Sequence, residues 1–255
     1  MKYVLVTGAA GGIGQAVVSS LSAAGYGILG LDLERALKTQ QLSSQQGRLH
    51  YRAVDVTDPE SMRELGRFLQ TENYPLQGLV CCAGLVHRQS LLKTSFSSWK
   101  KLQAVNADGV FLALQLVAQI MIDQASLDPT NSRSLVVVSS NAGHTARSEF
   151  GAYGASKAAA SQLAKSFGLQ LAAHGIRVNT ICPGTTKTAM VTDSWEGQDK
   201  SQQLIRGSLQ DYRLGIPLGR IAEPEDIAAV IEHLISPASR HMTMQTITVD
   251  GGASL

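Results

Sequence analysis

Cysteine is scarce in this chain, with three among 255 residues, at positions 81, 82 and 182. An odd and small number of cysteines does not build a disulfide framework. Their spacing also lacks the Cys-x-x-Cys pattern that is typical of a zinc site. We therefore expect three reduced thiols, no bound metal ion and a reducing compartment.

Charge and long apolar runs are also in short supply. Charged residues make up 16% of the chain, and 22 basic against 20 acidic side chains leave a net charge of +2. Such a balance gives no reason to expect a nucleic acid or an anionic membrane as partner. The longest largely apolar stretch, Val110–Ile122, contains Gln115 and Gln119 and is shorter than the roughly 20 residues that span a bilayer. Because the N-terminal apolar run is too short for a signal peptide, we expect a soluble cytoplasmic protein.

The chain does contain a regular alternation of apolar, strand-like segments with helix-like segments. Strands that are apolar throughout predict a parallel sheet covered by helices on both faces. We therefore predict one doubly wound α/β domain over residues 1–255, built on a seven-stranded parallel sheet. The expected strands are Lys2–Val6, Ile28–Leu31, Leu49–Val54, Leu79–Cys82, Leu135–Ser139, Arg177–Ile181 and Thr246–Val249. The expected helices are Ile13–Ala24, Pro59–Leu69 with Asp58 as its cap, Trp99–Gln124 and Tyr153–Ala173.

A polar insertion at about 185–219 breaks this alternation. It contains Trp195 and Tyr212 and follows the sixth expected strand. Open α/β sheets bind their ligands beyond the carboxyl ends of the strands. We interpret the insertion as a substrate lid, and the alternative is a plain surface excursion.

Glycine is concentrated in Thr7–Gly14, between the first strand and the first helix. Gly8, Gly12 and Gly14 permit a tight turn and the close approach of a pyrophosphate, which the N-terminus of the following helix attracts. A glycine-rich run alone indicates only a turn. Asp32, however, lies 18 residues beyond Gly14 at the end of the second strand, where a carboxylate binds an adenosine ribose. The combination predicts a dinucleotide site of the Rossmann type.

Asp32 also bears on the identity of the cofactor. Its carboxylate can accept hydrogen bonds from both ribose hydroxyls and would repel a 2′-phosphate. Leu33 and Glu34 follow it directly, and Arg35 is three positions away, so no basic residue lies beside it in sequence. We therefore expect NAD rather than NADP. The alternative role for Asp32 is that of a helix N-cap.

Tyr153 and Lys157 are four residues apart at the start of an expected helix, so they share one helix face. An ammonium group close to the phenol would lower the pKa of Tyr153, and a cationic nicotinamide would lower it further. The tyrosinate could then take the proton of an alcohol while a hydride leaves. Ser140, at the end of the fifth expected strand, could hydrogen-bond the substrate oxygen. Tyr-Lys pairs at this spacing also occur by chance, and the glycine loop and the serine make the catalytic interpretation stronger.

These residues, spread over almost the whole chain, resemble the short-chain dehydrogenase/reductase family. The glycine motif of the family matches Thr7–Gly14, and its catalytic set matches Ser140, Tyr153 and Lys157. The resemblance implies a fourth catalytic residue, Asn106, which supports a proton relay through water to the lysine. It also implies that the lysine holds the nicotinamide ribose. The cofactor contacts that it implies are Gly8, Gly12, Ile13, Gly14, Asp32, Asp55, Val56, Ala83, Gly84, Tyr153, Lys157, Pro183, Gly184 and Thr188.

One motif departs from the family pattern. Where the family has Asn-Asn-Ala-Gly, this chain has Cys81-Cys82-Ala83-Gly84. The small residues that let the cofactor approach are kept. The missing asparagines are not proton-transfer groups, so catalysis is still expected.

Three stretches of the sequence narrow the range of possible substrates. They are Ser140–Arg147, Ile205–Gly219 and Met242–Gln245. They resemble a branch of the family that oxidises a carboxylated cyclic diene diol to a catechol, with NAD as acceptor. The resemblance implies a cationic or donor-rich partner for the carboxylate. The candidate substrate contacts are Ser140, His144, Arg147 and Met190, with Arg88 and Arg206 behind them. The alternatives are a structural hydrogen bond for His144, an ion pair for Arg147 and simple packing for Met190.

Two rival functions stay open. One is another member of the family, such as a 3-oxoacyl carrier-protein reductase that uses NADPH, and Asp32 argues against it. The other is a cofactor-sensing protein without catalysis. An intact set of Asn106, Ser140, Tyr153 and Lys157 argues against that second rival.

The sequence also suggests self-association. The segment Val110–Ile122 is apolar on more than one helix face, and small residues at 158–160 permit the close approach of another helix. In the family these two helices form subunit interfaces, so the resemblance implies a homotetramer. The alternative is burial of both helices within a single subunit.

Overall fold

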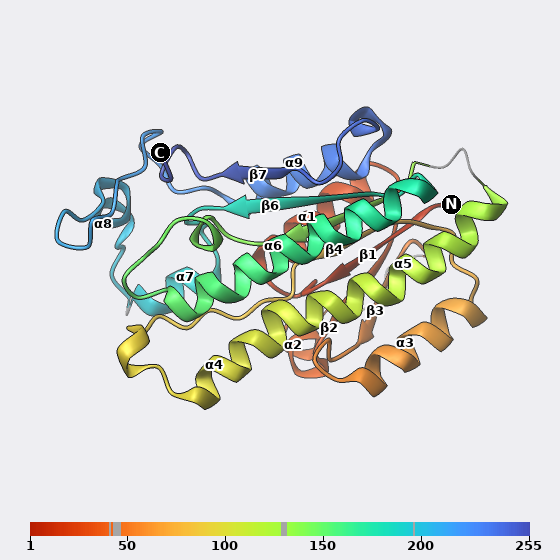
Figure 1. Ribbon diagram of the computed structural model, residues 1–255, viewed down its shortest axis with the longest axis horizontal. Helices are drawn as coiled ribbons and strands as arrows, with labels where there is room; N and C mark the ends of the chain where they lie inside the picture. Colours follow the sequence, from red (N-terminus) through yellow and green to blue (C-terminus); the bar gives the residue numbers. More distant parts are fainter. Residues whose placement is uncertain (41, 43–46, 129–131, 196) are drawn as a thin grey trace.

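One sheet organises the residues that this computed structural model describes, which are 1–40, 42, 47–128, 132–195 and 197–255. Its seven strands are all parallel and follow the order β3-β2-β1-β4-β5-β6-β7. Helices lie on both faces of the sheet (Figure 1), and the predicted doubly wound α/β fold is confirmed. The strands are β1 (Tyr3–Thr7), β2 (Gly27–Asp32), β3 (Leu49–Ala53), β4 (Leu76–Cys81), β5 (Ser134–Val138), β6 (Arg177–Pro183) and β7 (Thr246–Val249).

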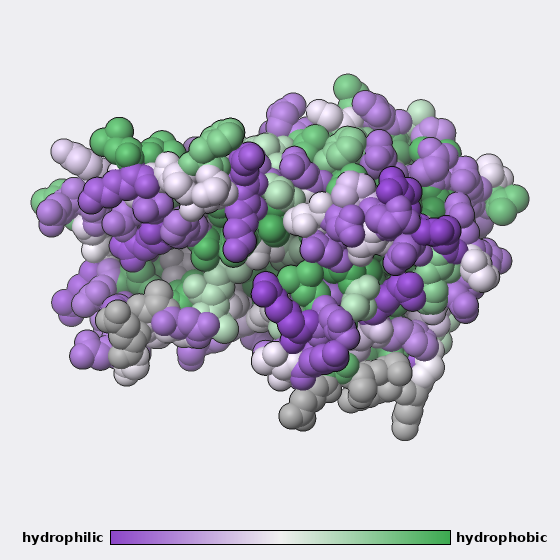
Figure 2. All heavy atoms as spheres, turned by 90° about the horizontal axis from the view of Figure 1, so that it is seen from below, coloured by the Kyte–Doolittle hydropathy of each residue, from purple (hydrophilic) through white to green (hydrophobic). Residues whose placement is uncertain are grey.

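The winding of the chain reverses at β1, which pairs with β2 on one side and with β4 on the other. Ligands of doubly wound sheets bind at this reversal, beyond the carboxyl ends of the strands. The arrows of β6 and β7 point to the left in Figure 1, and since all the strands are parallel, their carboxyl ends share that side. Seen from below, the surface is hollowed between the left-hand end and the main body (Figure 2). The fold therefore directs attention to this end.

Two apolar layers hold the helices on the sheet. In one layer, residues such as Leu65, Leu114 and Ala160 pack on one face of the sheet. In the other, residues such as Val17 and Ile231 pack on the opposite face. Burial of this apolar surface, at about 25 cal/mol per Å², is the main stabilising contribution. The helices are α1 (Gly12–Ala23), α2 (Glu34–Thr39), α3 (Pro59–Thr71), α4 (Phe96–Gln103), α5 (Gly109–Leu127), α6 (Gly151–Leu171), α7 (Ala189–Thr192), α8 (Ser201–Arg206) and α9 (Pro224–Ile235).

Helix α9 was not among the expected helices. It begins at Pro224, and Glu223 and Asp226 form a capping box around its first turn. Ile227 and Ile231, four residues apart, are fully buried in the layer that α9 shares with α1. Both signals are local in the sequence, because proline is favoured at the first helical position and glutamate can cap.

The expected helix Trp99–Gln124 is wrong in one respect. A π-helical segment, η2 (Ala104–Asp108), separates α4 from α5. The whole helical run Phe96–Leu127 has 32 residues and a mean hydropathy of 1.6 in its most apolar window, and this is long and apolar enough to cross a membrane. The sequence estimate considered only the shorter stretch Val110–Ile122. In the structure 56% of the apolar window is buried inside the protein, as in the core helix of a packed domain.

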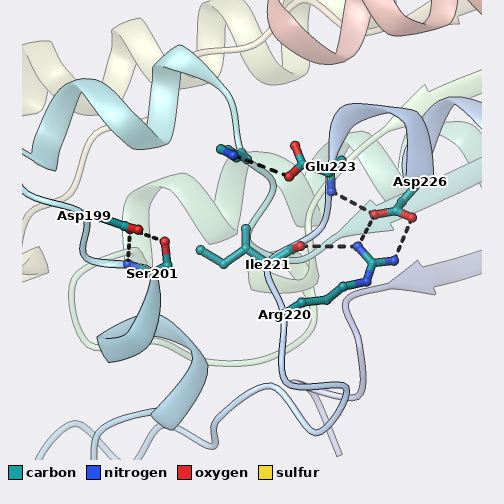
Figure 3. Close-up of polar contacts among 7 residues, drawn as sticks. Asp199, Ser201, Arg220, Ile221, Glu223 and Asp226 are labelled. Carbon is teal, nitrogen blue, oxygen red and sulfur yellow. Dashed lines mark hydrogen bonds and ion pairs between the residues drawn. The ribbon is translucent and has the colours of Figure 1, made fainter.

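The segment interpreted as a lid, 185–219, lies between β6 and α9 and carries α7 and α8. Its residue 196 lies outside the described residues. Just beyond the segment, the guanidinium of Arg220 donates to both carboxylate oxygens of Asp226 and to the carbonyl of Ile221, as Figure 3 shows. These contacts attach the end of the segment to the first turn of α9.

The same segment also packs on the last residues of the chain. Ile216, Ile221 and Ala253 form a small buried apolar cluster. The Leu218 N–H donates to the Gly251 carbonyl at 3.1 Å. The part of the segment that follows α8 is therefore held against the turn that follows β7.

Candidate active site

The glycine loop between β1 and α1 is closely packed. Gly8 has a φ of +67°, which favours glycine, and a Cβ at Gly14 would lie 2.0 Å from the Gly8 carbonyl oxygen. A Cβ at Gly12 would lie 2.7 Å from Cγ2 of Thr188, so the start of the segment 185–219 meets the loop there. Gly11 caps α1 without a side-chain hydrogen bond, and the first-turn N–H groups can therefore face an anion. This backbone cradle fits the pyrophosphate of a dinucleotide.

Asp32 ends β2 beside this loop. One carboxylate oxygen accepts from the Ala10 N–H at 2.9 Å, and the other accepts from the Leu33 N–H at 2.8 Å. Helix α2 begins only at Glu34, with Leu33 as its N-cap, so the alternative reading of Asp32 as a helix N-cap is wrong. The carboxylate is fixed against the glycine loop, in the position expected for a contact with an adenosine ribose.

Three further predicted cofactor contacts, Asp55, Val56 and Ile13, lie at the same edge of the sheet. The Asp55 carboxylate accepts from the N–H and the hydroxyl of Thr57 at 2.9 and 2.7 Å. Val56 packs on Gly109, where a Cβ would lie 2.8 Å from Val56 Cγ2. Ile13 is partly buried against the layer that α1 shares with α9. Asp55 and Val56 follow β3, and Ile13 follows the glycine loop, so all three are near carboxyl strand ends.

Asn106 and Lys157 lie on either side of Gly84. A Cβ at Gly84 would be 3.2 Å from Lys157 Nζ and 3.5 Å from Asn106 Oδ1. The Asn106 side chain is fully buried, donates to the Leu85 carbonyl and accepts from the Leu85 N–H, both at 2.8 Å, and donates to Ser156 Oγ at 2.9 Å. Asn106 belongs to η2, and such π-helical turns are frequent at functional sites. The structure thus brings together the two residues of the predicted relay.

Tyr153 lies in the first turn of α6, close to Ser140. Burial raises the pKa of the Tyr153 phenol, and a hydrogen bond with the Ser140 side chain lowers it. The Lys157 Nζ lies 6.0 Å from the centroid of the tyrosine ring and donates to the Val138 carbonyl at 2.9 Å. In the protein alone, burial is the largest cause and raises the pKa of Tyr153. The lowering of this pKa by Lys157 stays a prediction. Ionisation of this phenol calls for a further positive charge at the site.

Three free thiols lie around Lys157. All three thiols lie within electrostatic range of the lysine. Burial raises the pKa of Cys81 to about 12 and also raises the pKa of Cys82 and of Cys182. The thiols are therefore uncharged at neutral pH. The departure of Cys81-Cys82 from the family motif accordingly adds no charge beside the lysine.

Burial also lowers the pKa of Lys157 to about 8, and this makes stability depend on pH. Between pH about 8 and about 10.4 the unfolded chain binds more protons at this lysine than the folded chain, so the free energy of unfolding should rise with pH. In that window the free energy of unfolding of the wild type, relative to that of Lys157→Met, should rise by up to about 1.4 kcal/mol per pH unit. Urea unfolding at several pH values measures this difference. Lys165→Met, at an exposed lysine of the same helix, is the control, and the same trend for both variants would contradict the prediction.

The turn after β6 meets the strand end that carries Ser140. Pro183 ends β6, and a Cβ at the following Gly184 would lie 2.5 Å from the Asp250 Cβ. The Asp250 carboxylate accepts from the Asn141 side-chain amide at 3.1 Å. Pro183, Gly184 and Ser140 therefore lie around one point, where the predicted nicotinamide end of the cofactor would be.

Two predicted substrate contacts differ in how they are held. Met190, in α7, is 50% exposed, so its side chain is free to cover a ligand. The ring nitrogens of His144 lie 3.2 Å from the hydroxyls of Thr145 and Thr248. These two partners support the structural alternative for His144.

The arginines near the site also differ. Arg147 is half-buried in the loop that leads into α6 and interacts with the charge of Asp250. Arg88 is exposed and forms an ion pair with Glu149. Arg206 ends α8 and is exposed. Of the three arginines that the sequence suggested, Arg147 is the one that is half-buried and lies within electrostatic range of Asp250.

Sequence reasoning missed two residues of this region. The Ser156 hydroxyl oxygen accepts a hydrogen bond from the Asn106 side-chain amide. Its position on α6, three residues after Tyr153, is the sequence signal that could have identified it. Arg213, in the lid, lies within electrostatic range of Arg147 and Arg88. No local pattern predicts that proximity. Among the described residues, no group of three or more His, Cys, Asp and Glu side chains could hold a metal ion.

Known proteins share this arrangement over nearly the whole chain. A protein-family model described as "Enoyl-(Acyl carrier protein) reductase" matches residues 8–254. A solved oxidoreductase of the short-chain dehydrogenase/reductase family from Burkholderia thailandensis has a TM-score of 0.85 and 30% sequence identity, covering 99% of this chain and 92% of that chain. The chain therefore belongs to the short-chain dehydrogenase/reductase family, and it is an oxidoreductase.

Two relatives within the family are similar over their full length. The chain is 39% identical to the vibriobactin-specific 2,3-dihydro-2,3-dihydroxybenzoate dehydrogenase of Vibrio cholerae, covering 99% of this chain and 95% of that protein. It is 37% identical to the 2,3-dihydro-2,3-dihydroxybenzoate dehydrogenase of Bacillus subtilis, covering 100% and 96%.

Proposed function

We propose that this enzyme oxidises 2,3-dihydro-2,3-dihydroxybenzoate to 2,3-dihydroxybenzoate with NAD, as a step in the synthesis of a catechol siderophore. The names of its full-length relatives support the substrate. The observation that carries the proposal is the meeting of Ser140, Tyr153 and Lys157 beside a backbone cradle of glycines. That arrangement suits the removal of a hydride and a proton from an alcohol.

In the proposed mechanism Ser140 hydrogen-bonds the oxygen of the reacting carbinol. The nicotinamide supplies the hydride acceptor and a positive ring that favours ionisation of a nearby phenol. Tyr153, as the phenolate, takes the hydroxyl proton while the carbinol carbon loses its hydride, which leaves a ketone. The proton then passes through water toward Lys157 and Asn106. The ketone tautomerises to the catechol, and the aromaticity that it gains drives the oxidation.

Asp32 is proposed to select NAD. Replacing Asp32 by Ala should lower kcat/KM for NAD by roughly 10- to 100-fold, the effect of losing hydrogen bonds to a charged group. Activity with NADP should rise, because the repulsion of a 2′-phosphate is removed. The ratio of the two kcat/KM values is the measurement. Glu34→Ala removes an exposed acid two residues away and serves as the control, and an unchanged ratio in Asp32→Ala would contradict the assignment.

Incubation of the purified enzyme with the dihydrodiol and NAD tests the function. We expect NADH absorbance and the fluorescence of the aromatic product to appear together. No NADH above that of Tyr153→Phe would reject the substrate. Turnover of a 3-oxoacyl thioester with NADPH would instead favour a carrier-protein reductase, and tight cofactor binding without any turnover would favour a sensor.

We further propose one cytoplasmic catalytic domain over residues 1–255, with 185–219 as its lid, assembled as a homotetramer. Phe111 on α5 is 38% exposed and borders an open groove with Ala159 and Leu163 of α6. Gln103 and Asp108 line the same groove. Partly exposed apolar side chains among polar ones suit a subunit interface, which leaves the single-subunit alternative less favoured. Light scattering should report four subunits, and a monomer at micromolar concentration would refute the assembly.

A further inference from the structure

Two arginines from distant parts of the chain come close together on the substrate side of the site. Arg147 lies in the loop before α6, and Arg213 lies in the lid, and both are half-buried. Within the described part of the chain neither arginine forms an ion pair with a carboxylate. Burial lowers the pKa of both guanidinium groups, and the charges of Arg147 and Arg88 lower that of Arg213 further, whereas Asp250 acts in the opposite direction on Arg147 and Asp211 on Arg213. This arrangement is electrostatically unfavourable in the protein alone.

The surroundings of Asp250 place Arg147 near the reacting centre. The Asp250 carboxylate accepts from the side-chain amide of Asn141, the residue after Ser140, and from the Gly252 N–H at 3.0 Å. Asp250 also accepts a hydrogen bond from the Ser254 hydroxyl at 2.5 Å. Asp250 lies within electrostatic range of Arg147, and among the described residues the two form no direct ion pair. The guanidinium is left available to another anion.

A short hairpin in the lid presents Arg213. Ser208 and Arg213 exchange two backbone hydrogen bonds of 2.9 and 2.8 Å. The Arg213 guanidinium donates to the Leu204 carbonyl at 3.4 Å, a long hydrogen bond. Ile216, three residues further on, packs on Ala253 in the turn that follows β7. That turn also holds Asp250, so the hairpin and the loop of Arg147 are anchored to the same support.

We propose that Arg147 and Arg213 together bind the carboxylate of the substrate, with Arg213 as a specificity-determining residue supplied by the lid. This inference rests on the proposed function, which gives the substrate a carboxylate beside the diol. A carboxylate between two guanidinium groups removes their repulsion and accepts forked hydrogen bonds from each. Arg88 is less suited, since its charge is already paired with Glu149.

The binding of two ring compounds to the enzyme with NADH tests this pair. 2,3-Dihydroxybenzoate carries the carboxylate, and catechol is the same diol without it. In Arg213→Gln the Kd of 2,3-dihydroxybenzoate should rise roughly 10- to 100-fold, while the Kd of catechol should stay within about twofold. Lys187→Gln, which removes an exposed charge from the same lid, should change neither Kd. The Kd of 2,3-dihydroxybenzoate for Arg213→Lys should lie between those of the wild type and of Arg213→Gln. Lysine keeps the positive charge but cannot donate the two parallel hydrogen bonds of a guanidinium group.

An unchanged Kd of 2,3-dihydroxybenzoate in Arg213→Gln would overturn the inference. An equal loss of affinity for both compounds in Arg213→Gln would also overturn the inference, since Arg213 would then affect only the shape of the lid. Oxidation of the dihydrodiol by the wild type tests the proposed function separately. If the wild type oxidises the dihydrodiol and Arg213→Gln keeps the same KM, the inference alone fails. A wild type that neither oxidises the dihydrodiol nor prefers 2,3-dihydroxybenzoate over catechol refutes both.

Discussion

Replacing Tyr153 by Phe should lower kcat for the proposed oxidation by about 10²- to 10⁴-fold, the usual contribution of a general base. Phenylalanine keeps the ring and its edge-on contact with Phe150, whose centroid lies 6.0 Å away. It removes only the hydroxyl that hydrogen-bonds with Ser140 and, as the phenolate, takes the substrate proton. The fold and the binding of NADH should therefore be retained. Initial rates of NADH formation and a fluorescence titration with NADH measure these two expectations.

The control for this substitution is Tyr212→Phe. Tyr212 lies in the lid and is 95% exposed, so the loss of its hydroxyl should leave kcat within about twofold of the wild type, as for most exposed positions. If Tyr153→Phe folds, binds NADH and keeps more than about a tenth of the wild-type kcat, another group is the base. In that case the mechanism proposed for Tyr153 is wrong.

Replacing Gly14 by Ala should weaken NADH binding by roughly 10- to 100-fold, because a methyl group there has no space. Its Cβ would lie 2.0 Å from the Gly8 carbonyl oxygen and 2.9 Å from the Ala9 Cα, both of which are backbone atoms. The loop must shift to relieve this overlap, and overpacking of this kind costs about 1–3 kcal/mol. A shift of the loop displaces the N–H groups that face the pyrophosphate. Titration with NADH measures the Kd, and thermal unfolding measures the cost to the fold.

Gly11→Ala is the matched control in the same loop. Gly11 has a φ of −77°, which alanine adopts without strain, and its Cβ would lie 3.3 Å from the Gly8 carbonyl oxygen. Its NADH Kd should change by no more than about threefold, a loss below about 1 kcal/mol. Equal effects of the two substitutions would show that crowding at Gly14 does not determine cofactor binding.

The strands and the glycine loop could be predicted from the sequence because their signals are local. The expected strand Arg177–Ile181 is observed as Arg177–Pro183, and Lys2–Val6 as Tyr3–Thr7. A buried parallel strand needs a continuous apolar run, and that run can be read without knowing its neighbours. The position of Asp32 beside the glycine loop could be predicted for the same reason, since the spacing from Gly14 spans a single helix–strand unit.

The features that were missed depend on contacts between distant parts of the chain. The π-helical turn that carries Asn106 is supported by bonds to Leu85 and Ser156, which are 21 and 50 residues away. The pKa of Tyr153 follows from burial, which spacing alone does not report. Arg213 comes within electrostatic range of Arg147 because residues after it, such as Ile216, pack on the end of the chain. In each case tertiary packing, rather than local pattern, decides the outcome.

The three sulfhydryl groups around Lys157 have a practical consequence at the bench. Alkylating reagents react with the thiolate, and the raised pKa values of Cys81, Cys82 and Cys182 keep that form rare in the native fold. Denaturation returns all three to water and restores ordinary reactivity. Maleimide uptake therefore counts unfolded molecules directly, and it can rank every variant described above by integrity before any kinetic difference is interpreted.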